Sequence, residues 1–91
     1  MLKYIMDGGH GWLAISLAEF PDAEEFGTGY GFIDRQAGVI YLEEDCEATA
    51  FLRAHPHDRK QIKGEFIDGH APLRNFPRNE RRMESAWACG S

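Results

Sequence analysis

The sequence has little of what defines a membrane protein, an exported protein or a disulfide-rich domain. Its 91 residues include two cysteines, and its longest apolar stretch, Trp12 to Leu17, is interrupted by Ser16. That stretch is far shorter than the roughly 20 residues that cross a bilayer. The N-terminal residues also lack an apolar segment followed by a small-residue cleavage site. We therefore expect a cytoplasmic protein that does not contact membranes, with Cys46 and Cys89 as reduced thiols.

The residue spacings of common metal and nucleotide sites are missing as well. No Cys-x-x-Cys or His-Glu-x-x-His pattern accompanies the four histidines, and the pair His55 and His57 does not replace one. The glycine-rich residues 27–31 lead into a predicted strand, whereas a phosphate-binding loop requires a helix N-terminus after its glycines. The sequence therefore predicts neither a metal ion nor a cofactor.

What is present is typical of one small globular domain. Hydrophobic residues make up 43% and charged residues 27% of the chain, and the aromatic residues are six Phe, three Tyr and two Trp. These aromatics indicate a packed core, because each can bury about 150–250 Å² of surface. Ten Gly and four Pro in so short a chain predict frequent turns and short elements.

Runs of β-branched and aromatic residues between turn signals predict a mostly antiparallel sheet of about five strands. The two central hairpin strands are separated by a tight turn, in which Gly38 is expected to take a positive φ. The last strand carries Lys63 and Glu65, which suit the edge of a sheet. The expected strands are 2–6, 10–15, 30–34, 39–43 and 61–67.

One main helix is expected to pack on one face of this sheet. It runs from Cys46 to about His55, with Asp45 as its N-cap and apolar residues at helical spacing. A shorter helical turn precedes the third strand, and it begins either at Ser16, in a capping-box pattern, or at Pro21. The fold class is therefore α+β.

The sequence changes character after residue 68. Two prolines and several arginines follow, and Leu73 and Phe76 are the apolar residues that could anchor this region. We expect a single α+β domain over residues 1–68 and an extended, basic, Pro-containing C-terminal arm over residues 69–91.

Charge is distributed unevenly along the chain. Residues 1–50 hold ten acidic and two basic residues, residues 51–91 hold five acidic and eight basic residues, and the net charge is −5. Such asymmetry favours charged partners, although a solvated acidic surface with a basic tail folded onto it gives the same pattern. Direct nucleic-acid binding by the arginines is not favoured, because nucleic-acid-binding domains usually carry a basic footprint.

Two motifs together carry a resemblance to known proteins. The first is His10-Gly11-Trp12-Leu13, directly after an Asp-Gly turn, and the second is Tyr41 to Cys46 at a strand-to-helix junction. The combination resembles a group of short, uncharacterised proteins of bacteria and of their phages and plasmids. The resemblance covers roughly residues 3–55, with a departure at Glu47, where Asp is expected. It implies a mobile-element context and no particular activity.

A catalytic or metal-dependent site is the alternative function. A helix N-terminus lowers the pKa of a thiol, whereas neighbouring carboxylates raise it, so the two influences oppose each other at Cys46. His10 lies between two glycines and could form an acid/base pair with a carboxylate within hydrogen-bond reach. The candidate catalytic residues are His10, Glu44, Asp45 and Cys46.

The sequence favours a non-enzymatic protein-interaction module over an enzyme. The expected partner is a host protein that handles nucleic acid, which a mobile-element protein would modulate or inhibit by placing acidic residues in its basic groove. A homodimer formed through the C-terminal arm is a further expectation. The expected partner-binding residues are Glu24, Glu25, Glu43, Glu44, Glu47, Arg74, Phe76 and Arg78.

Overall fold

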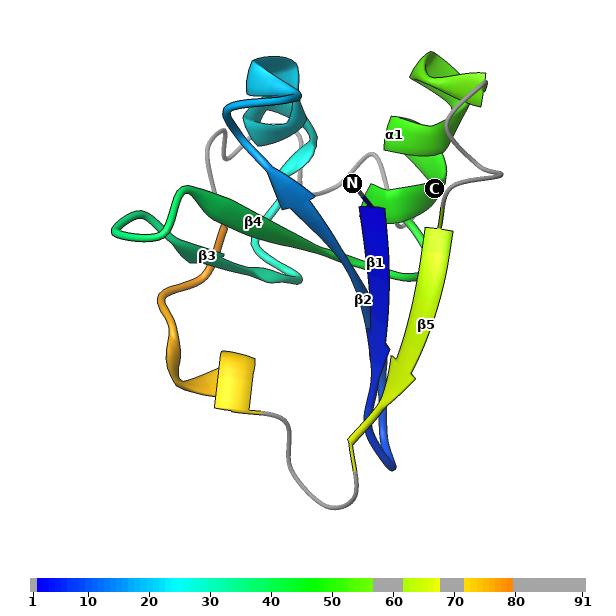
Figure 1. Cartoon of the computed structure of the whole chain (residues 1–91), viewed down its shortest axis with the longest axis vertical. Helices are drawn as coiled ribbons and strands as arrows, with labels where there is room; N and C mark the ends of the chain where they lie inside the picture. Colours follow the sequence, from blue (N-terminus) through cyan, green and yellow to red (C-terminus); the bar gives the residue numbers. More distant parts are fainter. Residues whose placement is uncertain (1, 57–61, 68–71, 80–91) are drawn as a thin grey trace.

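The computed structural model describes residues 2–56, 62–67 and 72–79. In this part of the chain, five strands form one sheet in the order β3-β4-β2-β1-β5 (Figure 1). Strands β1 and β5 are parallel, and the other neighbouring strands are antiparallel. The predicted α+β class, with a mostly antiparallel sheet of five strands and one main helix, is confirmed. No helix of the described ranges has the length and apolar character needed to cross a membrane.

The strand limits follow the predicted runs closely. Strand β4 has the predicted limits, and the turn before it closes through Gly38, whose φ is +70°. Strand β3 starts later than predicted, because the backbone N–H groups of Tyr30 and Gly31 donate to buried side chains instead of a strand partner. The strands are β1 (Leu2–Met6), β2 (Gly11–Ser16), β3 (Phe32–Asp34), β4 (Val39–Glu43) and β5 (Ile62–Phe66).

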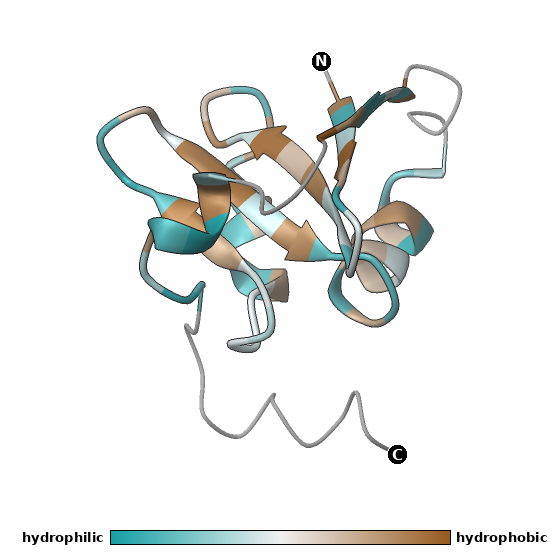
Figure 2. Cartoon of the chain, turned by 90° about the horizontal axis from the view of Figure 1, so that it is seen from below, coloured by the Kyte–Doolittle hydropathy of each residue, from teal (hydrophilic) through white to brown (hydrophobic). Residues whose placement is uncertain are grey.

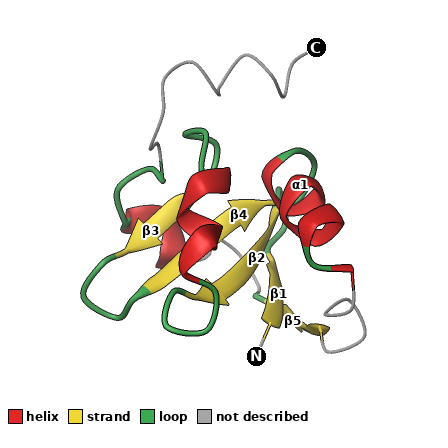
Figure 3. Ribbon diagram, turned by 90° about the horizontal axis from the view of Figure 1, so that it is seen from above, coloured by secondary structure: helices red, strands yellow, loops and turns green. Residues whose placement is uncertain are grey.

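One face of the sheet holds the main core. Helix α1 (Glu47–Ala54) and the 3-10 helix η1 (Pro21–Phe26) pack on this face (Figure 3). Of the two predicted starts for the short helical turn, Pro21 is the one that begins η1. Alternate residues of the strands supply the apolar side chains, as the alternating colours of Figure 2 illustrate. Fully buried members include Leu2, Leu13, Ile15, Ile40, Leu42 and Phe51.

The start of α1 differs from the prediction. Cys46 precedes the first helical residue, and no side chain of that position caps the helix. Instead, Oε1 of Glu43 accepts hydrogen bonds from the backbone N–H groups of Asp45 and Cys46, at 3.1 and 3.3 Å. The expected Asp45 cap is therefore wrong, because a carboxylate at the end of β4 already satisfies the donors at this junction.

The opposite face of the sheet carries a second apolar cluster, in which Trp12, Phe32 and Leu73 are buried. Leu73 belongs to the 3-10 helix η3 (Pro72–Asn75). After η3 the chain runs beside β3, where the N–H of Ile33 donates to the carbonyl of Pro77 at 2.9 Å. We call residues 72–79 the C-terminal segment; it lies against the sheet (Figure 1). This described part of the expected arm is therefore packed and not extended, and residues 69–71 and 80–91 lie outside the described ranges.

Candidate functional site

Among the described charged residues, Glu47 is the least exposed as a whole residue, at 2%. Its carboxylate accepts five hydrogen bonds, at 2.7 to 3.1 Å. A fully hydrogen-bonded carboxylate tolerates burial because each lone pair that loses water gains a donor. Glu47 was expected on a partner-binding surface; this expectation is wrong, since the side chain lies inside the molecule. The donors are the N–H and hydroxyl of Thr28, the N–H groups of Tyr30 and Glu43, and the amide of Asn79.

Asn79, which is 3% exposed, completes this buried network. Its Oδ1 accepts from the N–H groups of Gly29 and Gly31, at 3.0 and 3.2 Å. Its Nδ2 donates to Oε1 of Glu47 at 2.8 Å and to the carbonyl of Tyr41 at 3.1 Å. An Asn side chain has two donors and two acceptor sites, so Asn79 is fully used. One amide therefore ties the end of the C-terminal segment to the glycine-rich residues 27–31 and to α1.

A second polar contact holds the start of the C-terminal segment. The side chain of Asp7 is 1% exposed and forms a two-pronged ion pair with Arg74, at 2.8 and 3.0 Å. Oδ1 of Asp7 also accepts from the N–H groups of Gly9 and His10, both at 3.0 Å, which closes the predicted turn. Because a guanidinium carries only donors, Nδ1 of His10 accepts from Arg74 at 3.1 Å.

Two arginines of the C-terminal segment lie over aromatic rings of the sheet. The guanidinium of Arg74 lies 4.9 Å from the ring centre of Trp12, and that of Arg78 lies 4.5 Å from the ring centre of Phe32. Such cation–π contacts stabilise a charged group over a ring face. Phe76 stacks on Tyr41 with the rings 6° from parallel. The expected partner-binding residues Arg74 and Phe76 thus contact the protein's own sheet.

Arg78 and the remaining acidic candidates lie nearer to solvent. Arg78 is exposed and donates to the carbonyl of Tyr30 at 3.0 Å. Glu24 forms an ion pair with Arg35 at 3.1 Å. Glu25 is exposed and also takes part in further contacts within the molecule. Of the expected set, therefore, Arg78, Glu24 and Glu25 keep part of their surface available, although each already has an intramolecular partner.

Three consecutive carboxylates lie at the junction of β4 and α1. We call Glu43, Glu44 and Asp45 the acidic cluster; Asp45 is exposed and the two glutamates are half-buried. Among the described residues, no Lys, Arg or His forms an ion pair with any of the three. Burial first, and then the charge and hydrogen bond of Glu44, raise the pKa of Tyr4 to about 12. Part of this rise in the pKa of Tyr4 therefore comes from the negative charges of the acidic cluster.

The backbone near His10 lies close to the acidic cluster, but the side chains of His10 and Glu44 lie on different faces of the sheet. Strands β2 and β4 are neighbours, and the N–H of Glu44 donates to the carbonyl of Gly11 at 3.0 Å. The His10 ring, however, stacks near Trp12 on the sheet face that carries the C-terminal segment. Glu44 turns to the other face, where its carboxylate accepts from the Tyr4 hydroxyl at 3.4 Å. No hydrogen bond between described residues joins His10 to Glu44 or Asp45.

The chemistry expected at Cys46 also changes. Cys46 is disulfide-bonded in the structure, and the described residues include no free cysteine. The expected reduced thiol at this position is therefore wrong, and a disulfide sulfur cannot serve as the thiolate nucleophile. Cys89 lies outside the described residues. Within the described ranges, no group of three or more His, Cys, Asp or Glu side chains could hold a metal ion.

Sequence reasoning missed two of the residues that organise this region, Asp7 and Asn79. The turn at Asp7 was predicted, and its Asp-Gly-Gly pattern is the signal for the two turn hydrogen bonds. The ion pair between Asp7 and Arg74 has no local signal in the sequence, because the two residues are 67 positions apart. Asn79 lies among prolines and arginines, where nothing marks one amide as buried.

Comparison of the chain with known protein families, with curated proteins and with solved structures found no match.

Proposed function

We propose that the protein is a non-enzymatic interaction module that binds a basic groove of a host nucleic-acid-handling protein in the cytoplasm and modulates or inhibits it. The observation that carries this proposal is the acidic cluster, whose three carboxylates have no ion-pair partner among the described residues. Uncompensated charge at a surface steers association with an oppositely charged partner. The resemblance to proteins of phages and plasmids supports a mobile-element origin and a host target.

The arrangement of the other polar residues supports a binding role in preference to catalysis. The most chemically suggestive side chains (Glu47, Asn79 and Asp7) are buried and hydrogen-bonded within the molecule. These hydrogen bonds hold segments of the fold together. The acidic cluster, by contrast, is held at the surface by a regular junction between β4 and α1, which is a rigid support for a docking surface.

The first experiment compares three forms of the protein as immobilised baits for host proteins. The test variant combines Glu43→Gln with Glu44→Gln, which removes two charges and keeps an acceptor oxygen at position 43 for the helix start. The control combines Glu19→Gln with Asp34→Asn, which removes two charges elsewhere and keeps the acceptor for the N–H of Ala37. Proteins that bind the wild type and the control, but not the test variant, are the candidates.

The identified partner is then measured in solution. We expect the association rate of the wild type to fall steeply between about 50 mM and 200 mM salt, and the test variant to associate about tenfold more slowly at low salt. A DNA or RNA duplex should compete with the protein for the partner. Equal retention by all three baits, or an affinity that is indifferent to salt, would exclude the acidic cluster as the docking surface.

The cytoplasmic location is a part of this proposal that the disulfide bond at Cys46 opposes, because the cytoplasm keeps most thiols reduced. Alkylating all thiols at lysis, and then counting the alkylated cysteines of the denatured protein by mass, tests this point. If the location is cytoplasmic, both cysteines should be alkylated, in spite of the disulfide bond at Cys46 in the structure. Protein in which neither cysteine is alkylated would come from an oxidising compartment.

A further inference from the structure

The outer edge of β5 offers a surface that the proposed function does not use. In the described part of the chain, β5 is the last strand of the sheet and pairs on one side with β1 (Figure 1). The N–H of Ile67 donates to the carbonyl of Met6 at 2.7 Å. Since alternate residues of a strand turn their N–H and C=O groups to opposite sides, Ile62, Gly64 and Phe66 turn theirs away from β1. The edge therefore presents donors and acceptors in the pattern that another strand would pair with.

The side chains of this edge are complementary to themselves. From Ile62 to Phe66 the order is apolar, positive, glycine, negative, apolar. If a second copy of β5 runs antiparallel with Gly64 opposite Gly64, Lys63 of each copy faces Glu65 of the other, and Ile62 faces Phe66. The same register makes the glycines a hydrogen-bonded pair and allows up to about six main-chain hydrogen bonds. A two-fold axis midway between the two Gly64 residues relates the two copies, as in most homodimers.

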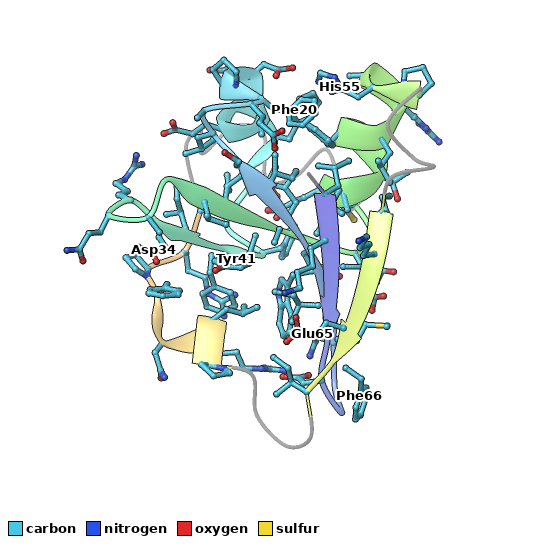
Figure 4. The ribbon with its side chains drawn as sticks, in the orientation of Figure 1. Phe20, Asp34, Tyr41, His55, Glu65 and Phe66 are labelled. Atoms are coloured by element: carbon cyan, nitrogen blue, oxygen red, sulfur yellow. The ribbon has the colours of Figure 1, made fainter. Side chains whose placement is uncertain are left out.

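The apolar residues at the end of β5 support the same pairing. Phe66 is 65% exposed and Met6 is 38% exposed. They are register partners in the parallel pair of β1 and β5, so both lie at the same end of the sheet. Figure 4 shows Phe66 at the outer end of β5. A large aromatic side chain left in water is unfavourable, and packing against Ile62 of a second copy would bury part of it.

The charges also select one register. Lys63 forms no ion pair with a described residue, and Glu65 pairs with Lys3 on β1. Shifting the second strand by two residues in one direction places Lys63 opposite Lys63, and in the other direction places Glu65 opposite Glu65. Like charges directly opposite each other destabilise a strand pair. Charged edges discourage pairing with unrelated strands. The order of charges along β5, however, is complementary to the same order in an antiparallel second copy.

We propose that two copies of the protein associate through antiparallel pairing of their β5 strands, with Lys63 of each copy opposite Glu65 of the other. The dimer is one continuous sheet across both copies. It uses neither the acidic cluster nor the C-terminal segment, so its failure would leave the proposed function standing.

Charge-reversal variants test the proposal by sedimentation equilibrium of the full chain. Lys63→Glu places two acidic side chains opposite each other at both symmetric positions, and Glu65→Lys places two basic side chains there. Each variant alone should dimerise at least about tenfold more weakly than the wild type, because two attractive cross-strand pairs become repulsive. Both positions are exposed, and circular dichroism spectra should match the wild type.

Mixing the two variants separates this register from a general effect of charge. The Lys63→Glu chain carries acidic side chains at positions 63 and 65, and the Glu65→Lys chain carries basic side chains at both. In the mixture these positions face each other, so a one-to-one heterodimer should form with about the wild-type affinity. Arg53→Glu changes the net charge by the same amount as Lys63→Glu at an exposed position of α1, and it should dimerise like the wild type.

Three results would overturn the proposal. The first is a wild type that stays monomeric up to about 1 mM, the concentration scale of weak association. The second is a dimer that both single variants leave intact, which would place the contact elsewhere, for example in the C-terminal arm. The third is a mixture of the two variants that stays monomeric, which would exclude the register centred on Gly64.

Discussion

At the residue scale, buried polar side chains connect segments that are distant in the sequence. Glu47 and Asn79 are 32 positions apart, yet they share a hydrogen bond of 2.8 Å in the interior. Every buried side-chain nitrogen and oxygen in the described residues has a hydrogen-bond partner. Such networks are stable only when they are complete, because an unsatisfied donor in the interior loses its water without replacement.

Replacing Glu47 with Ala should therefore be strongly destabilising. The change leaves several buried donors without an acceptor, and we expect the free energy of unfolding to fall by about 3 kcal/mol or more. Glu47→Gln keeps one acceptor oxygen and should lose less. Urea denaturation, followed by tryptophan fluorescence, measures both. Arg53→Ala, an exposed change on the same helix, serves as the control and should stay within about 0.5 kcal/mol of the wild type. Equal stability of Glu47→Ala and this control would contradict the network's role.

The position of Glu47 also marks a limit of sequence reasoning. A glutamate in the first turn of a helix is normally solvated and interacts with the helix dipole, so a surface location was the reasonable prediction. Its burial depends on donors from Thr28, Tyr30 and Asn79, which no local pattern places nearby. The surface position of the acidic cluster was easier to predict, because three consecutive carboxylates cannot all be buried.

At the scale of elements, residues 27–31 form a close contact between backbones. A Cβ atom added at Gly31 would lie 1.9 Å from the carbonyl oxygen of Tyr41 and 2.7 Å from Nδ2 of Asn79. These glycines lead into a strand, β3, as predicted. Their actual role is to let the chain pass close to β4 while its N–H groups reach Glu47 and Asn79.

We therefore expect Gly31→Ala to destabilise the protein by about 3 kcal/mol, because the added methyl group displaces backbone and not a flexible side chain. Gly8→Ala is the matched control, since a Cβ at that position meets nothing within 4 Å, and it should change stability by less than about 0.5 kcal/mol. Thermal unfolding of the two variants under one set of conditions makes the comparison. Similar midpoints for both would show that the loop relaxes around the methyl group.

The elements that were predicted well are those with a local signal. The run Val39-Ile40-Tyr41 and the turn at Gly38 specify β4 and its hairpin from neighbouring residues alone. The C-terminal segment has no such signal, because Leu73, Arg74 and Asn79 act through partners far away in the chain. The predicted extended arm followed from its prolines and arginines, whereas long-range packing decides its position.

At the scale of the whole molecule, the sheet is covered on both faces by different means. Helices α1 and η1 cover one face with a conventional apolar core. The C-terminal segment covers part of the other face with Leu73, Phe76 and two arginines stacked on aromatic rings. A domain that ended at residue 68, as expected, would lack the C-terminal segment that covers this face of the sheet.

Two truncated chains decide whether residues 1–68 form an independent domain. A chain that ends at Asn79 keeps the C-terminal segment, and one that ends at Asp68 loses it; both lack Cys89, so the comparison is matched. Without the segment, Trp12 and Phe32 lose their cover and the buried carboxylates of Asp7 and Glu47 lose partners. We expect the shorter chain to lose several kcal/mol of stability, of the roughly 5–15 kcal/mol typical of a small domain, or to lose cooperative unfolding altogether.

Trp12 reports this loss directly, since it is the one tryptophan that both truncated chains retain. It is 2% exposed with the C-terminal segment in place, and its emission in the shorter chain should shift to longer wavelength as water reaches the ring. Equal urea midpoints and equal emission for the two chains would support a domain boundary at residue 68. A large difference would make residues 72–79 part of the folding unit, because their side chains complete the interior on one face of the sheet.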